Sequence, residues 1–589
     1  MATAALQSRL NKKAMSTEYY KKALTGLREE AAIFARANPA LAPHLAGPSP
    51  DPDVERLLEG VAYLTGNIQQ KLDEDFPEFA QGIMQLAFPH YLRPLPSATI
   101  IQFTPKNILK GKLSIPAGTY IDSIDVEGTK CRFRTCYEVE ALPLTITDAS
   151  IVDLGSSRKR IELSFNLSNV RVSEWHSDKL RFHLHGDLSD ATNLFMALQH
   201  YLDKITVETQ AGQYDVETDQ LKPGGMSTDE GLIPYPGNAF PAYRLIQEYY
   251  LLKEKFLFLD LHGINDWKNN LGSGQFKLIF ECKDMPFVLP RINSDWFALH
   301  TTPAINLFEH EAEPTAITHR QSEVQLRPSR SKGENTQVYD IKSIVGHNRK
   351  QAKKTEYKPL GMFDPNEQSA PVYQTTFRPS ASGKTNEPYL TISYPADYDI
   401  PDQETIIAQL TCSNGSLPAG LRPGEICKAT SSTSELVEFK NITPATDCYQ
   451  VPTGKNVLWR LMSHLSLNLL SLADAENLKA LLNLYIFGGG KNRNEEMADR
   501  RRIESISDLT VSTEDRFVSG LIMRGQAINI TARIDHFACH GDFYLFGTLL
   551  NQLLASFSSI NCYTRLIFKD EASGEEFSWP AMLGGRPLT

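Results

Sequence analysis

The sequence has 589 residues, which is too long for a single hydrophobic core and predicts about three or four domains of roughly 150 residues each. Hydrophobic residues make up 41% of the chain and charged residues 22%, as in ordinary soluble globular proteins. The formal net charge of −10 argues against a general nucleic-acid or anionic-membrane binder, because attraction to phosphates needs a basic surface.

Targeting and redox signals are sparse. No stretch approaches the roughly 18 uninterrupted apolar residues of a membrane-spanning helix, so we expect no direct membrane insertion. The N-terminus MATAALQSRLNKK has no apolar segment after a basic start, so we expect no export signal and a cytoplasmic protein. The eight cysteines include no C-x-x-C pair, and we expect reduced thiols.

Residues 1–95 predict an N-terminal helical arm. A first helix begins at a cap near Ser16 and stops at Asn38-Pro39, and a second begins at Asp51-Pro52. A third is expected from the D-x-x-E pattern that begins at Asp75. Apolar residues at spacings of three and four give the first two helices a narrow stripe each. These candidate interface residues are Tyr20, Leu24, Leu27 and Phe34 on the first helix, and Val54, Leu57, Val61, Leu64, Ile68 and Leu72 on the second.

Two roles for these stripes stay open at this point. They could close on each other as a small bundle within the chain, or form the seam that a coiled-coil partner would use. Three helices of this size rarely bury enough apolar surface alone, so the bundle is not favoured over the partner.

The segment FPHYLRPLPS, residues 88–97, lies where the helical period gives way to a period of two. Prolines restrict their own φ and the conformation of the residue before them, so the segment predicts a stiff joint between the helical arm and a β-rich body. The alternative is the rim of an active site around His90 and Arg93, but the sequence places no carboxylate or nucleophile beside them. The predicted joint residues are Phe88, Pro89, Tyr91, Pro94 and Pro96.

The expected fold class is α+β and multidomain, with the helical arm followed by β-rich, sandwich-like or barrel-like domains and interspersed helices. Short alternating segments separated by Gly, Pro and Asn predict the strands. The polar, basic segment 327–358 predicts a long exposed loop on either side of one strand. The expected domains are 1–95 (helical arm), 96–230 (β-rich), 231–455 (β-rich, with the polar loop 327–358) and 456–589 (α+β).

One string resembles a nucleotide-binding loop. SGKT, residues 382–385, ends like a phosphate loop, but Arg378 stands where the first glycine is required and a strand-like segment follows instead of a helix. We therefore expect no nucleotide cofactor.

Two strings carry possible metal ligands. His183 and His185 would share one face of a strand at a spacing that suits zinc, but no third ligand is evident. In HFACHGD, His536, Cys539 and His540 cluster, yet the glutamate of an H-E-x-x-H site is absent. We therefore expect no metal and no enzymatic activity, and we keep a metal-dependent β-rich hydrolase at these clusters as the less favoured alternative.

Several blocks resemble the TssF family (also called ImpG or VasA) of the bacterial type VI secretion baseplate. The most specific string is FPEF…FPHYLRPLPS, and further blocks follow in the same order along the chain. They are IPAGTYI (115–121), 232–261, HTTPAINLFEHEAEP (300–314), VYDIKSIVG (338–346), 458–474, 543–566 and WPAMLGGRP (579–587).

This resemblance implies a structural role without catalysis. Two copies of a TssF-like protein join one TssG-like subunit in each wedge, around the spike hub and beneath a contractile sheath. The implied partners are a TssG-like subunit, a second copy of the chain, a TssK-like adaptor, and sheath-initiating and spike-hub proteins. The implied location is the inner face of the bacterial envelope, and the main alternative within this class is a wedge protein of a contractile phage tail.

Overall fold

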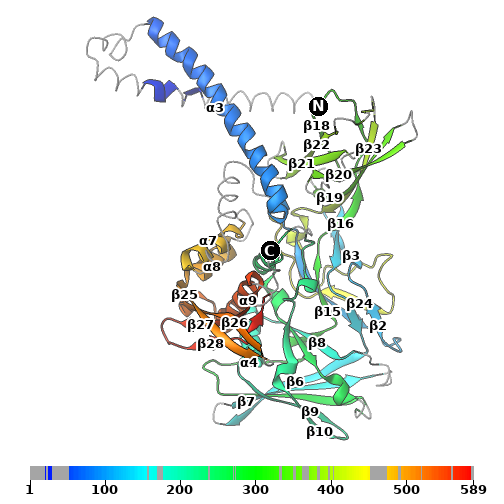
Figure 1. The fold of residues 1–589 in the computed structure, drawn as a ribbon. Helices are drawn as coiled ribbons and strands as arrows, with labels where there is room; N and C mark the ends of the chain where they lie inside the picture. Colours follow the sequence, from blue (N-terminus) through cyan, green and yellow to red (C-terminus); the bar gives the residue numbers. More distant parts are fainter. Residues whose placement is uncertain are drawn as a thin grey trace.

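The computed structural model describes residues 20–21, 24–28, 52–155, 158–168, 175, 177–235, 239–268, 271, 274–329, 335–348, 353–360, 371–380, 385–395, 398, 400–401, 404–450, 474–487, 493–518, 521–558 and 562–584. The predicted α+β class is confirmed, because a few helices accompany many strands that form six sheets in this part of the chain. A long helix stands away from the body (Figure 1).

That helix is α3 (Pro52–Ala87), a single element of 36 residues and about 54 Å at 1.5 Å per residue. The prediction of a separate third helix starting at Asp75 is wrong, because the helix continues through this point. A D-x-x-E pattern suits the solvated face of a continuing helix as well as a helix start, so it does not mark a boundary here. The short helix η1 (Pro89–Leu92) follows directly and leads into the body.

The body contains three sheets and a two-stranded ribbon. Helices α4 (Leu188–Gln199) and α5 (Ala242–Leu251) pack into its core. The first sheet, in spatial order, is β24 (Val437–Asn441), β1 (Ala98–Pro105), β15 (Thr301–Ile305), β4 (Thr129–Thr135) and β3 (Tyr120–Val126). The second is β10 (Gly212–Val216), β9 (Leu202–Thr209), β13 (Gln275–Cys282), β7 (Arg158–Leu167) and β6 (Leu144–Gly155). The third is β11 (Leu221–Gly224), β12 (Phe258–His262), β8 (Lys179–Leu184) and β14 (Phe297–Leu299), and β2 (Leu113–Ile115) pairs with β5 (Val139–Ala141).

Strand pairing in the body crosses the expected boundary between residues 230 and 231. Strand β1 pairs with β15 on one side and with β24 on the other, and β13 pairs with both β7 and β9. Segments from the two expected β-rich domains therefore share sheets and build one body.

The described strands between Phe308 and Ser413 form a separate sheet with its own apolar core, and in the sequence they lie between β15 and β24. In Figure 1 it lies beside α3, at the upper right. Its strands, in spatial order, are β16 (Phe308–Glu311), β23 (Glu404–Ser413), β19 (Gln337–Asn348), β20 (Lys353–Pro359), β21 (Val372–Pro379), β22 (Asn386–Ser393) and β18 (Glu323–Gln325), with β17 (Thr315–Ile317) on β23. We call this unit the inserted domain.

The prediction of a long polar loop at 327–358 is wrong for residues 353–358, which form a strand, whereas residues 330–334 and 349–352 lie outside the described residues. Beside the expected strand, now β19, the basic stretch forms β20, and the two strands pair as an antiparallel hairpin. In KKTEYKP the buried Tyr357 alternates with the exposed Lys354 and Glu356. The stretch has the period of a strand, but its polar composition indicated a loop.

The C-terminal unit is an α+β layer. The elements of this unit are α7 (Ala475–Leu484), α8 (Arg493–Glu504), β25 (Ile506–Val518), β26 (Leu521–Ala532), α9 (His540–Phe557), β27 (Tyr563–Asp570), β28 (Glu576–Ser578) and β29 (Met582–Leu583). Helix α9 connects the parallel strands β26 and β27 and packs against α4 and α5 of the body. The largest apolar core is continuous from the base of α3 through the body to this unit.

Candidate functional site

The N-terminal half of α3 exposes large apolar side chains. Leu57, Val61 and Leu64 are 69%, 46% and 63% exposed. At about 100° per residue these three positions fall within about 60° around the helix axis. We call them the exposed stripe. Contiguous exposed apolar residues on a projecting element are typical of a protein–protein contact surface.

The other predicted interface residues are only partly described. On the first predicted helix, Leu24 is buried and Tyr20 and Leu27 are half-buried. Phe34 and the side chains of Val54, Ile68 and Leu72 lie outside the described residues, although the backbone of the last three belongs to α3.

The C-terminal end of α3 is held by the body and by the inserted domain. The Met84 side chain is fully buried in the largest core. One turn earlier, the Gln81 side-chain amide donates a hydrogen bond of 3.4 Å to the carbonyl oxygen of Phe377 in β21. A Cβ added at Gly82 would lie 2.9 Å from the Gln374 side chain, so α3 and β21 approach closely there.

His90 sits in an aromatic stack just after α3. Its ring lies 5.4 Å from the ring of Tyr243 and 6.0 Å from that of Tyr485, with interplanar angles of 13° and 9°. A hydrogen bond of 2.9 Å joins His90 Nε2 and Tyr485 Oη. The neighbouring Tyr91 Oη donates a hydrogen bond of 2.9 Å to the carbonyl oxygen of Leu484. Helix α7 and helix α5 are thus both fastened to the joint.

Arg93 and Leu95 connect the joint to strand β19 of the inserted domain and to the segment at Tyr449. Arg93 forms an ion pair with Asp340 of β19, and its guanidinium lies 5.6 Å from the ring centre of Tyr339. Leu95 exchanges backbone hydrogen bonds of 2.8 and 2.9 Å with Tyr449. His90 and Arg93, the candidate residues of an active-site rim, thus have aromatic and ionic partners that fix the joint.

The structure places all five predicted joint residues between α3 and the body. Tyr91, Pro94 and Pro96 are buried, and Phe88 and Pro89 are half-buried. The sequence did not indicate their partners, because Tyr243, Tyr485 and Asp340 are distant in the chain. The one available signal was the aromatic and proline content of LIPYPGNAFPAYR, residues 232–244.

The two histidine-rich strings have structural partners. His183 is buried, its Nε2 lies 2.8 Å from the carbonyl oxygen of Glu254, and burial lowers its pKa to about 4. His540 begins α9, where the Cys539 sulfur caps the helix by accepting from the Asp542 backbone N–H. Among the described residues, no group of three or more His, Cys, Asp or Glu side chains is placed to hold a metal ion. SGKT at 382–385 lies largely outside the described residues.

Asp542 belongs to a buried ionic network that the sequence did not reveal. Arg502 Nη2 lies 2.8 Å from an Asp542 carboxylate oxygen, and Arg502 Nη1 lies 2.8 Å from Asp499. Lys253 in the body reaches the same Asp499 at 3.0 Å. All four side chains are at most 10% exposed, so the network fastens the C-terminal unit to the body.

Among the described helices, none combines the length and the apolar character that crossing a membrane requires. A strand-rich body carries a projecting helix with an exposed apolar stripe, which is typical of a subunit that contacts other proteins in a larger assembly.

Comparison with known proteins identifies that assembly. The family model "Type VI secretion system, TssF" matches residues 13–586. The type VI secretion system component TssF1 of Pseudomonas aeruginosa is 27% identical, over 97% of this chain and 99% of that protein. A chain of the type VI secretion system TssK-TssF-TssG baseplate subcomplex is similar with a TM-score of 0.78 and 27% identity, covering 91% of this chain and 99% of the other. A chain of a type VI secretion baseplate complex shares the fold, with a TM-score of 0.59 and 22% identity.

These matches span nearly the whole chain in each comparison. The protein described here belongs to the TssF family, a baseplate component of the type VI secretion system.

Proposed function

We propose that this chain is a structural wedge subunit that assembles with a TssG-like subunit and a TssK-like adaptor. The observation that carries the proposal is the exposed stripe on α3, since Leu57 and Leu64 keep most of their surface in contact with solvent. The similar chain comes from a subcomplex of TssK, TssF and TssG, which supports this choice of partners.

The stripe suits a helical partner. Spacings of four and three residues between Leu57, Val61 and Leu64 are those of a coiled-coil seam, which buries a narrow line of side chains against another helix. A helix about 54 Å long offers room for several turns of such contact. The TssG-like subunit and the second copy of this chain in the wedge are the proposed occupants.

The joint is the second part of the proposal. The hydrogen bonds of His90 and Tyr91, the ion pair of Arg93 and the strand-like pairing of Leu95 hold the base of α3 from three sides. Buried prolines add a restricted backbone. We infer that these contacts keep α3 at one angle to the body, so that a partner on the helix is placed relative to the rest of the wedge.

The remaining aspects of this function are also proposals. We infer that the chain has no catalytic role, that spike-hub and sheath-initiating proteins are further neighbours, and that the baseplate lies in the cytoplasm at the inner face of the envelope. The described residues that carried candidate chemistry, His183 and the HFACHGD segment, are occupied by packing, capping and ionic contacts.

Co-expression with the TssG-like and TssK-like proteins of the same gene cluster tests the proposal. Light scattering on the size-exclusion peak should give two copies of this chain for each TssG-like subunit, and metal analysis should give less than stoichiometric metal. A monomer that ignores both partners and retains one metal ion per chain would favour the hydrolase alternative. A gene neighbourhood of virion proteins, without genes for a membrane complex, would favour the phage-tail alternative.

A further inference from the structure

A groove of about 800 Å³ lies between the base of α3 and the inserted domain. Figure 1 shows the inserted domain beside the lower end of this helix. Gly82 and Leu86 of α3 belong to one wall, and residues of β19, β20 and β21 form the other. Binding sites in proteins commonly have volumes of about 300–1,000 Å³, so the groove is large enough to receive side chains of a partner.

The groove opens where β20 and β21 separate. Among the described residues, these strands pair in parallel at two positions, near Pro359 and Tyr373. Away from these positions β20 follows β19, and β21 follows β22. Helix α3 approaches the separated part of β21, where the Gln81 amide donates to the carbonyl oxygen of Phe377. Contacts within the chain therefore hold both walls, and the groove is already formed before a partner binds.

The exposed stripe of α3 leads into this groove. About eight turns of helix separate Leu86 from Leu57, and at 100° per residue the two positions differ by only about 20° around the helix axis. Leu86 thus falls within the arc of about 60° that the exposed stripe occupies. Gly82, one turn earlier, falls within the same arc. A partner helix that follows the stripe from Leu57 therefore reaches the groove about 44 Å further along α3.

Both walls of the groove expose an apolar side chain to water. Leu86 is 49% exposed on the α3 wall, and Leu360, which directly follows β20, is 40% exposed on the wall of the inserted domain. Leu92 and Tyr373 also line the groove and are nearly buried. Covering the two exposed leucines with a partner is favourable, because it removes apolar surface from water.

The charges of the groove are nearly balanced. Arg93 and Asp340 of the lining pair with each other, and Lys342 pairs with Glu309 outside the lining. The remaining charged residues of the lining are one anion and one cation of β20, Glu356 and Lys358. The groove therefore does not favour a strongly charged ligand, and apolar contacts must supply most of the affinity for an occupant.

The exposed stripe alone is too small to hold a partner. Each subunit of a stable complex usually buries about 800 Å² of surface, which is more than three side chains can expose. The groove offers additional apolar surface on the same line of the helix.

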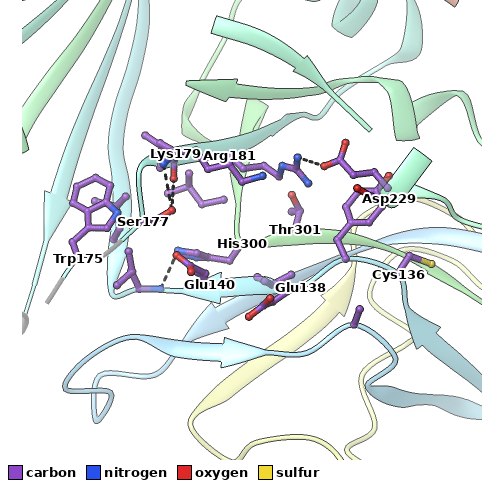
Figure 2. A pocket seen from close by; sticks show the side chains of 18 residues that line it. Cys136, Glu138, Glu140, Trp175, Ser177, Lys179, Arg181, Asp229, His300 and Thr301 are labelled. Atoms are coloured by element: carbon purple, nitrogen blue, oxygen red, sulfur yellow. Dashed lines mark hydrogen bonds and ion pairs between the residues drawn. The ribbon is translucent and has the colours of Figure 1, made fainter. Parts of the chain in front are cut away.

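The cavity shown in Figure 2 is a poorer candidate for a partner. It has a volume of about 370 Å³ and lies between β5, β8 and β15. Charged residues of its lining are already paired within the chain: Arg181 and Lys179 with Asp260, and Glu140 with Lys112.

We propose that the groove receives the end of an amphipathic helix of the TssG-like subunit, and that this helix lies along the exposed stripe. Large apolar side chains of its terminal turn enter between Leu86 and Leu360, as in other contacts in which a helix packs into an apolar groove. The choice of the TssG-like subunit rests on the proposed function, which the similar chain from a TssK-TssF-TssG subcomplex supports.

Biolayer interferometry with the full chain and the purified TssG-like subunit tests this proposal. Leu86→Gln combined with Leu360→Gln should raise the Kd roughly 10- to 100-fold, because about half of each leucine surface is buried by the partner. Ile108→Gln combined with Ile400→Gln is the matched control. These isoleucines are 65% and 51% exposed and lie outside the groove, so the Kd should change by less than about threefold.

Cross-linking identifies the occupant and remains decisive if the double variant fails to fold. The photoreactive residue p-benzoylphenylalanine, placed at the exposed position of Leu360, should cross-link to a helical segment of the TssG-like subunit in the assembled complex. A cross-link to a second copy of this chain or to the TssK-like adaptor would overturn the proposal. So would the absence of any cross-link in the assembled complex.

Failure of this inference can be distinguished from failure of the proposed function. The stripe variant, Leu57→Gln combined with Leu64→Gln, is measured in the same experiment. If it loses affinity while the groove variant retains it, the groove lies outside the interface and the proposed function stands. If the unmodified chain does not bind the TssG-like subunit, the proposed function fails, and this inference fails with it.

Discussion

The exposed stripe on α3 leads to a quantitative prediction for Leu57→Gln combined with Leu64→Gln. The two leucines are 69% and 63% exposed in the isolated chain. Fully burying a leucine side chain is worth about 1.5–3 kcal/mol, so burying the remaining two-thirds of each contributes about 1–2 kcal/mol. Together they should contribute about 2–4 kcal/mol to assembly, and the Kd for the TssG-like subunit should rise roughly 30- to 1000-fold.

The same variant should leave the isolated chain intact. Substitutions at exposed positions usually change the free energy of unfolding by less than about 0.5 kcal/mol, and glutamine retains a helix propensity close to that of leucine. Tyr63→Gln is the matched control, because Tyr63 is 56% exposed on the same helix but outside the stripe. Its Kd should stay within about threefold of the unmodified protein.

Biolayer interferometry with purified subunits measures these affinities, and thermal unfolding of each variant checks the fold. An unchanged Kd in the double variant, or an equal loss in Tyr63→Gln, would refute the role of the stripe in assembly. A large loss of thermal stability in the isolated double variant would instead assign the stripe to contacts within this chain, as in the small-bundle alternative.

Three further predictions concern stability. Asp542→Ala should lower the free energy of unfolding by about 3–5 kcal/mol, because it leaves a buried arginine without one of its two carboxylates; calorimetry checks this. Gly541→Ala should lower the melting temperature of the full chain, since its Cβ would lie 2.1 Å from the backbone of Thr192 and would force α9 away from α4. Burial lowers the pKa of His183 and of His300 to about 4. The unfolded chain therefore binds more protons than the folded chain between about pH 6.5 and 4, and stability should fall as the pH falls through this window, by up to about 1.4 kcal/mol per pH unit for each histidine. The double variant His183→Gln, His300→Asn should show a smaller change of the urea unfolding midpoint between about pH 6.5 and 4. An unchanged slope of the midpoint against pH would contradict this prediction.

The contacts of the joint connect the projecting helix to several parts of the chain. One ten-residue segment touches α5, α7 and the inserted domain, through His90, Tyr91 and Arg93. A displacement of any of these parts would have to break buried hydrogen bonds or an ion pair before the angle of α3 changed. The base of the projecting helix is therefore held by contacts with α5, with α7 and with the inserted domain.

Local pattern in the sequence was sufficient for the apolar stripe of α3, for the first strands and for the position of the joint. The spacing of Leu57, Val61 and Leu64 predicted a helix with one apolar stripe, because a period of 3.6 residues is a property of the backbone alone. The change to a period of two after residue 97 predicted the strands β1 to β7. The string FPHYLRPLPS and the blocks that follow it also indicated the TssF family, which the comparisons confirm.

Only the tertiary structure decided which distant segments share a sheet and which side chains meet. Strand β1 lies between β15 and β24, about 200 and 340 residues further along the chain, and this pairing joins the two expected β-rich domains. The sequence predicts a loop where the polar strand β20 forms, because its pairing with β19 and the burial of Tyr357 become evident only in the folded sheet. The buried ionic network of Arg502, Asp499, Asp542 and Lys253 has the same cause: its members come from separate elements, and the sequence contains no local signal for contacts that packing alone assembles.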